Sequence, residues 1–412
     1  MFFIKRYNLI EVYMINIGVL THSIADNYGA NLQALSTGYY LRKNGFNPIF
    51  FKWDPYPSNN NSEQLKLHHT FLQRHGFELT SNCLSDEDFV EVLRKYDIKF
   101  IIVGSDCVFT HAHYTIPYRL SRKGIVKKQA LPDWVFPNPF WLPFLERTPD
   151  VKAVIMSGSC GCSDLDKTSN EVSKKMSKCL DRFSYISVRD EYTRISLAHI
   201  LGEDKSNLLP ITPDPVFSFN QNVNDNTTKE QIMLKYNLPD KYIVTAYYKS
   251  GLPKTSWLQE LKNEFNKLGY KIVNLTMPQG TDPYPYDINI NLPLDTMDWY
   301  NLIKYSNGYI GNNMHPIIVS IHNTVPFYSV NEHGKFYLRR LIQSVKHTKE
   351  YELLNRFNLL KYHTGINKIH SVSPLSIVQS VINFDVVSCK KCAKILHDEY
   401  KEMMKNILSM IE

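Results

Sequence analysis

Short runs of apolar residues alternate with longer amphipathic stretches along most of the chain. The apolar runs are typical of buried strands and occupy residues 15–20, 48–53, 100–106, 151–159, 185–190, 242–248 and 270–275. The stretches between them have the apolar spacing of helices, at residues 31–43, 86–96, 170–183, 191–201 and 255–268. Strands that alternate with helices predict parallel sheets covered by helices on both faces. We therefore expect an α/β protein whose two halves are doubly wound and Rossmann-like.

The polar stretch 220–226 separates the two halves. We expect a first domain at 14–230, a second at 231–345 and a mostly helical segment at 346–412. Residues 1–13 precede the first strand and are expected to be an extension outside the fold. They lack the uninterrupted apolar core and the cleavage site of a signal peptide.

One segment of the first domain, residues 107–147, has many aromatic residues and prolines but little helical or strand period. Loops of this length inside compact domains are usually lids or binding loops. We expect a lid that recognises an acceptor, with Trp134 as its contact residue. A packed decoration of the domain is the alternative.

The stretch 298–334 carries the clearest candidate site. It predicts a helix, a buried strand ending at Ile310, a turn through 311–313 and a second helix opening at His315-Pro316. The loop after a parallel strand faces the ligand crevice, and a helix N-terminus attracts anions. The pattern predicts an anion-handling site with a histidine, although a histidine at a helix start is more often a cap or packing residue.

Other strand ends point to the same edge. Asp106 and Arg189 each follow a buried strand, where a guanidinium suits a carboxylate or phosphate. The alternatives are a helix cap for Asp106 and a salt bridge to Asp190 or Glu191 for Arg189. The loop 26–29, with Asn27 and Tyr28, is either a ligand loop or a simple turn. It lacks the glycine spacing of a dinucleotide fingerprint.

Composition narrows the class of protein. The chain has 412 residues, 43% hydrophobic and 21% charged, with a formal net charge of +7. The cations are scattered, so no nucleic-acid module is expected. Seven cysteines, an odd number, favour a reducing compartment, and no apolar run is long enough to span a membrane, so we expect a cytoplasmic location. We expect no metal, because the pair Cys160 and Cys162 is too closely spaced to join Cys389 and Cys392 in an ordinary zinc site.

Five segments together resemble the polysaccharide pyruvyl transferase family. They are NYGANLQALSTGYYLRKNG (27–45), IIVGSD (101–106), SVRDEYTRISL (187–197), PDPVF (213–217) and DWYNLIKYSNGYIGNNMHPIIVSIHNTVPFYSV (298–330). The resemblance implies a GT-B-like fold, two Rossmann-like domains facing an interdomain crevice, followed by C-terminal helices. It also implies transfer of pyruvate from phosphoenolpyruvate, with no other cofactor, onto a sugar as a ketal. The acceptor it implies is a galactose-like sugar, forming a 4,6-ketal, on an undecaprenyl-diphosphate-linked capsular or exopolysaccharide unit at the inner membrane face.

The resemblance also assigns residues. His315 matches the family's histidine and would be the general acid, or, if the helix N-terminus holds it neutral, a hydrogen-bond donor to phosphate. Arg189 matches the SVRD arginine and would clamp the donor's carboxylate or phosphate. Beside these two, we expect Asp106, from its place at a strand end, to activate the hydroxyl. Asn313 stands where many members carry Arg or Ser, and cations elsewhere would compensate. The full donor set is Lys249, Asn312, Asn313 and Lys335, and the acceptor set is Asn27, Tyr28 and Trp134. Two other functions stay open: a nucleotide-sugar glycosyltransferase, or an inactive scaffold in glycan assembly.

Overall fold

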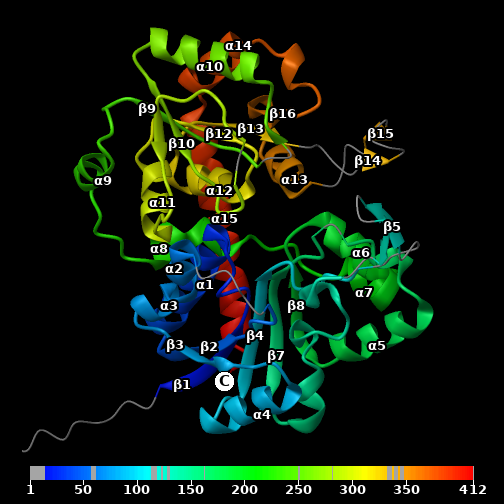
Figure 1. Cartoon of the computed structure of the whole chain (residues 1–412). Helices are drawn as coiled ribbons and strands as arrows, with labels where there is room; N and C mark the ends of the chain where they lie inside the picture. Colours follow the sequence, from blue (N-terminus) through cyan, green and yellow to red (C-terminus); the bar gives the residue numbers. More distant parts are fainter. Residues whose placement is uncertain are drawn as a thin grey trace, which may run out of the picture.

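The computed structural model describes residues 14–56, 62–112, 118–121, 124–127, 130–161, 163–248, 251–280, 282–331, 336–337, 342–343 and 348–411. The expected extension 1–13 and the predicted donor residues Lys249 and Lys335 lie outside these residues. Two six-stranded sheets dominate the described part, each flanked by helices (Figure 1). The predicted α/β fold with two doubly wound sheets is confirmed.

The first sheet has the order β3-β2-β1-β4-β7-β8, and all its neighbours pair in parallel. Its strands are β1 (Ile15–Leu20), β2 (Phe46–Lys52), β3 (Glu78–Asn82), β4 (Phe100–Asp106), β7 (Lys152–Gly158) and β8 (Phe183–Val188). Its α-helices are α1 (Tyr28–Lys43), α2 (Glu63–His69), α3 (Phe71–Arg74), α4 (Asp86–Lys95), α5 (Asn170–Leu180), α6 (Glu191–Leu201) and α7 (Glu203–Asn207). The central strands are fully buried because both faces are covered, as parallel sheets require.

The second sheet has the order β11-β10-β9-β12-β13-β16 and is also parallel throughout. Its strands are β9 (Tyr242–Ala246), β10 (Lys271–Leu275), β11 (Ile288–Ile290), β12 (Tyr309–Gly311), β13 (Phe327–Asn331) and β16 (His363–Gly365). The α-helices from the linker onward are α8 (Phe219–Asn222), α9 (Lys229–Tyr236), α10 (Thr255–Lys267), α11 (Thr296–Lys304), α12 (Met314–Asn323), α13 (Lys349–Arg356), α14 (Pro374–Ile382) and α15 (Val386–Leu408). The segment 346–412 is thus largely helical, as expected, and also adds the edge strand β16.

The last helix, α15, connects the two halves (Figure 1). At its start the Cys389 thiol contacts the carbonyl of Ile321 in α12 at 3.5 Å. Near its end Tyr400 packs edge-on against Tyr40 of α1, with ring centroids 5.5 Å apart. The 3-10 helix η5 (Pro215–Ser218) packs against α1, α12 and α15, so the linker region is part of the shared core.

The predicted lid is largely a packed part of the first domain. Residues 118–121 and 124–127 form the hairpin β5–β6 (Tyr118–Ser121, Gly124–Lys127), and three 3-10 helices follow: η1 (Pro132–Trp134), η2 (Pro139–Trp141) and η3 (Pro143–Arg147). Phe140, Trp141 and Phe144 are buried in the core of the first sheet. These three rings pack in the core, as the alternative interpretation expects, whereas Trp134 and Phe136 are only half-buried and Asp133 and Phe140 also line a cavity. The remaining 3-10 helices are η4 (Leu165–Lys167), η7 (Leu360–Tyr362) and η8 (Ile369–Ser371), and one small hairpin is β14–β15 (Phe336–Tyr337, Ile342–Gln343).

Candidate functional site

A buried ion cluster lies where strands β4 and β8 of the first sheet end. Arg189 follows β8, and its guanidinium donates to Asp214 Oδ2 at 2.8 Å and to Asp106 Oδ1 at 3.4 Å. The Asp214 side chain also accepts from the backbone N–H of Val216, so it fixes the start of η5. The salt-bridge alternative for Arg189 was right in kind but wrong in partner. Asp190 instead caps α6, accepting from the backbone N–H of Thr193.

His315 reaches this cluster from the other half of the molecule. It lies in the first turn of α12, and its Nε2 is 3.8 Å from Asp214 Oδ2. The side-chain amide of Gln33, from α1, donates to Asp214 and lies 3.4 Å from His315 Nε2. The imidazole ring packs so closely on Gly29 that a Cβ there would lie 2.1 Å from the ring. The N-termini of α1 and α12 therefore meet at this histidine.

The environment sets the protonation of both predicted catalytic groups. Burial lowers the pKa of His315 despite the opposing effect of Asp214 and Asp106, so the imidazole is neutral at pH 7. Burial alone would raise the pKa of Asp106, but the positive charges of Arg189, His22 and Lys349 outweigh it and hold that pKa well below its usual range. Asp106 is therefore a firmly ionised partner of Arg189.

A lysine that sequence reasoning missed joins the cluster. Lys349, the first residue of α13, places its Nζ 3.5 Å from the thiol of Cys107. Burial and Arg189 lower its pKa, but Cys107, Asp190 and Asp106 raise it further, and the pKa stays above its ordinary value. Lys349 is therefore a buried cation close to Arg189.

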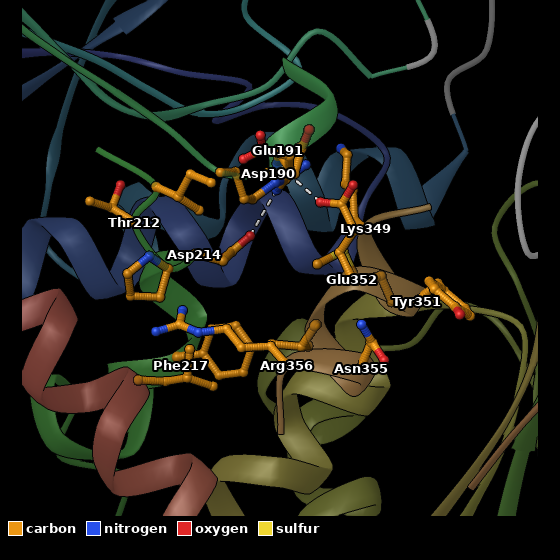
Figure 2. A pocket seen from close by; sticks show the side chains of 16 residues that line it. Asp190, Glu191, Thr212, Asp214, Phe217, Lys349, Tyr351, Glu352, Asn355 and Arg356 are labelled. Atoms are coloured by element: carbon orange, nitrogen blue, oxygen red, sulfur yellow. Dashed lines mark hydrogen bonds and ion pairs between the residues drawn. The ribbon is translucent and has the colours of Figure 1, made fainter. Parts of the chain in front are cut away.

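Arg189, Asp214 and Lys349 line one cavity of about 430 Å³. Figure 2 shows Asp214, Lys349 and Glu352 arranged around it. The rest of the lining mixes apolar residues such as Phe217 and Leu353 with three carboxylates and a guanidinium, from Asp190, Glu191, Glu352 and Arg356. Among the described residues no hydrogen-bond acceptor meets the buried Nε–H of Arg189. A buried guanidinium N–H without a partner is costly, and the two cations Arg189 and Lys349 in the lining favour an anion in this cavity.

Glu352 ties α13 to the first domain across this cavity. Its carboxylate accepts from the backbone N–H of Glu191, the first residue of α6, at 3.0 Å. Burial and the nearby Asp190 raise the pKa of Glu352 to about 7. The wall made by α13 thus contains a group that titrates near neutrality.

The structure gives the predicted turn residues a positioning role. Asn312 Oδ1 accepts from the backbone N–H of Tyr248 at 2.8 Å, and Asn313 Nδ2 donates to the carbonyl of Ala246 at 3.3 Å. Both amides therefore hold the turn against the end of β9. Neither lines the cavity beside Arg189, whereas Asn313 lines a small cleft of about 30 Å³ next to His315.

The predicted acceptor residues fall in two places. Asn27 and Tyr28 line the same small cleft, but Asn27 Oδ1 caps α1 and the Tyr28 ring stacks on Trp299 at 5.1 Å. Trp134 lies in η1, lines none of the cavities found among the described residues, and is not brought to the site. The sequence placed the loop 26–29 at the correct edge of the sheet. It did not show that Asn27 and Tyr28 already make structural contacts.

Two of the residues that the prediction missed lay within its own motifs. Gln33 falls in the stretch 27–45 and Asp214 in 213–217, yet a single sequence does not show that they meet His315. Lys349 carried no local signal, because it starts a short helix far from any predicted strand end. Within the described ranges, no three His, Cys, Asp or Glu side chains gather as a metal site would require, and no helix there has the length and apolarity needed to cross a bilayer.

Solved structures with a similar fold include two epimerases and a glycosyltransferase. A UDP-N-acetylglucosamine 2-epimerase from Neisseria meningitidis bound to UDP-GlcNAc superposes with a TM-score of 0.53 at 10% identity, over 96% of this chain and 100% of that one. A putative UDP-N-acetylglucosamine 2-epimerase from Listeria monocytogenes gives 0.51 at 10%, over 92% and 91%. The spinosyn rhamnosyltransferase SpnG gives 0.51 at 8%, over 94% and 97%. At these identities the likeness shows the GT-B fold alone.

Comparison by sequence points to one family. A family model described as polysaccharide pyruvyl transferase matches residues 27–334, which include Arg189, Asp214 and His315. No curated protein matches the chain.

Proposed function

The chain belongs to the polysaccharide pyruvyl transferase family, and we propose that it moves pyruvate from phosphoenolpyruvate onto a glycan sugar, with release of phosphate. The acceptor we propose is a galactose-like residue of a lipid-linked capsular or exopolysaccharide unit, carrying the product as a 4,6-ketal. Family membership supports the reaction type. The chemistry of the cavity beside Arg189 supports phosphoenolpyruvate as the donor.

One observation carries the donor assignment: the Arg189 guanidinium and the Lys349 ammonium line one cavity, and the buried Nε–H of Arg189 has no acceptor among the described residues. Phosphoenolpyruvate has a carboxylate and a phosphate, and both groups are recognised by cations and N–H donors. The neutral imidazole of His315, 3.8 Å from Asp214, adds a group that can hold or deliver a proton. The three residues supply the charge and the acid that this donor requires.

The reaction can be written with all its protons. His315, protonated once the donor's negative charge has arrived, gives a proton to the methylene carbon of phosphoenolpyruvate. A sugar hydroxyl bonds to C2 and loses its proton. Phosphate then leaves with the C–O bonding pair, and a second hydroxyl closes the ketal. Of the two hydroxyl protons lost, one restores the acid and the other leaves with phosphate.

Asp106 is better suited to holding Arg189 than to accepting a proton. Its pKa is held well below the usual range, and a carboxylate with so low a pKa is a weak base. We therefore assign Asp106 and Asp214 to the orientation of the guanidinium, and look elsewhere for the group that activates the hydroxyl.

The direct test is phosphate release from phosphoenolpyruvate by the purified protein, with and without methyl galactosides and lipid-linked acceptors. We expect release that depends on the acceptor, with a mass gain of one pyruvate ketal. Arg189→Ala and His315→Ala should abolish it, whereas Asp97→Asn, at an exposed position beside Lys99, should not. Sugar transfer from a nucleotide sugar, with no phosphate release from phosphoenolpyruvate, would instead identify a glycosyltransferase. No turnover with either donor would favour the scaffold.

A further inference from the structure

A second cavity lies where strands β1 and β2 end, on the first domain. Its volume is about 250 Å³, slightly below the ~300 Å³ at which pockets for drug-sized ligands begin. Its walls include His22, Asp26, Trp53, Tyr56, Asp133 and Phe140. The size suits one small polar molecule, such as a single sugar ring.

Aromatic rings form one wall. Trp53 packs edge-on against Phe140, with ring centroids 5.2 Å apart. The His22 ring also contacts Phe140, with centroids 4.7 Å apart. Phe140 is fully buried, so it fixes the two outer rings in place. Rings held in this way present flat apolar surface at little entropic cost, which is what the C–H face of a sugar requires.

Carboxylates form the rim. The Tyr56 hydroxyl donates to Asp133, so both side chains are held, and Asp54 lies two residues before Tyr56 on the same rim. No Lys or Arg occurs among the described residues that line this cavity. Carboxylates are acceptors for hydroxyl groups and repel anions. The cavity is therefore suited to a neutral polyol and unsuited to phosphoenolpyruvate.

Asp26 connects this cavity to His315, because it lines both the cavity and the small cleft beside the histidine. Its Oδ1 lies 3.2 Å from His68 Nε2, but Gln64 donates to that nitrogen, so it has no proton to give to Asp26. Among the described residues no hydrogen-bond donor meets Asp26 Oδ1. Burial raises the pKa of this carboxyl above its ordinary value, which makes it a stronger base than Asp106.

We propose that this cavity binds the acceptor sugar and that Asp26 accepts the proton of the attacking hydroxyl. This inference rests on the proposed function. The hydroxyl oxygen bonds to C2 of the donor while its proton passes to Asp26, and that proton leaves with phosphate when the ketal closes. The acceptor thus lies on the first domain, on the aromatic wall, and its reacting hydroxyl points past Asp26 toward His315.

Kinetics on three variants test the assignment. Trp53→Ala should raise the acceptor KM by about tenfold with little change in kcat, and Trp53→Phe should restore most of the loss. Asp26→Asn should lower kcat by about 10²-fold or more with the acceptor KM nearly unchanged. The KM for phosphoenolpyruvate should stay within about twofold in all three, and Asp97→Asn is the matched carboxylate control.

A binding measurement separates failure of the site from failure of the function. Saturation-transfer NMR with methyl β-galactoside reports sugar binding without any donor. Signal in the wild type that is lost in Trp53→Ala supports the cavity even if phosphoenolpyruvate is not turned over, an outcome that would sink only the proposed donor. Normal turnover with an unchanged acceptor KM in Trp53→Ala overturns the cavity and leaves the function standing. A raised acceptor KM in Trp134→Ala, with none in Trp53→Ala, would return acceptor binding to η1.

Discussion

Gly29 is the position where one added carbon should separate activity from stability. It lies in the first turn of α1, against the imidazole of His315 from α12. A Cβ at Gly29 would lie 2.1 Å from Cγ and Nδ1 of that ring, whereas ordinary van der Waals contact begins at 3.4 Å. Gly29→Ala therefore requires the imidazole to retreat by about 1.3 Å, away from its place beside Asp214.

Gly29→Ala should lower kcat strongly but change the melting temperature little. Displacing a reacting group by about 1 Å can cost about 10²-fold in rate, so kcat should fall at least that far. The backbone of Gly29 is helical, with no positive φ, and alanine in a helix is favoured over glycine by about 1 kcal/mol. That gain offsets much of the strain, and we expect the melting temperature of Gly29→Ala to change by only a few degrees.

Gly38 on the same helix provides the matched control. A Cβ there would meet the Phe77 ring at 2.8 Å, in the core and away from His315. Gly38→Ala gains the same helix propensity against a milder overlap, so it too should change the melting temperature by only a few degrees, and it should leave kcat and both KM values near wild type. Initial rates of phosphate release and thermal unfolding of the two variants would decide the matter. Wild-type kcat in Gly29→Ala would refute the claim that the contact between α1 and α12 positions the histidine.

Three further outcomes are expected. Arg189→Lys keeps the charge but cannot hold both carboxylates, so kcat should fall by about 10²-fold and the melting temperature should drop. Arg194→Lys on α6 is the control. Unchanged kinetics in Arg189→Lys would mean that the paired N–H groups of the guanidinium are not needed. Calorimetric titration with phosphoenolpyruvate in two buffers of different ionisation enthalpy should give different heats, because the donor's charge raises the lowered pKa of His315 and the imidazole takes up a proton. Equal heats, or a difference that survives in His315→Gln, would exclude proton uptake by His315. The pKa of Glu352 is about 7 in the folded protein against roughly 4.3 in the unfolded chain, so wild-type stability should fall as pH rises through that window. Glu352→Gln should therefore melt higher than wild type at pH 8.5 but not at pH 4. A pH-independent difference, as expected for the exposed control Glu91→Gln, would contradict the assignment.

The fold and the edge that carries the site were predictable from local patterns. Apolar runs alternating with amphipathic stretches predicted parallel sheets, and the C-terminal ends of parallel strands must share an edge. That geometry alone brought Asp106 and Arg189 to the crevice. The helix opening at His315-Pro316 was predicted from the proline and the apolar period, and α12 begins one residue earlier, at Met314.

The partners of these residues were not predictable, because they depend on how the two halves pack. The alternative to a donor clamp for Arg189 was a salt bridge to a sequence neighbour, but the carboxylates that it contacts stand 25 and 83 positions away. The sequence left the loop 26–29 open between a ligand-binding loop and a simple turn. Two of its residues are engaged in the fold, Asn27 as a helix cap and Tyr28 as a stacked ring, which leaves Asp26 to face the open space.

The charges around Arg189 explain why the histidine starts neutral. Asp106 and Asp214 contact Arg189, and Lys349 and Asp190 add a positive and a negative charge close to it. Asp214 and Asp106 favour a protonated His315, but burial, helped by Arg189 and Lys349, outweighs them and keeps the pKa of His315 low. A donor that brings a carboxylate and a phosphate leaves the cluster negative, and protonation of His315 is the nearest way to offset that charge. In the proposed reaction, the donor would therefore favour the protonated form of the acid that its own methylene carbon needs.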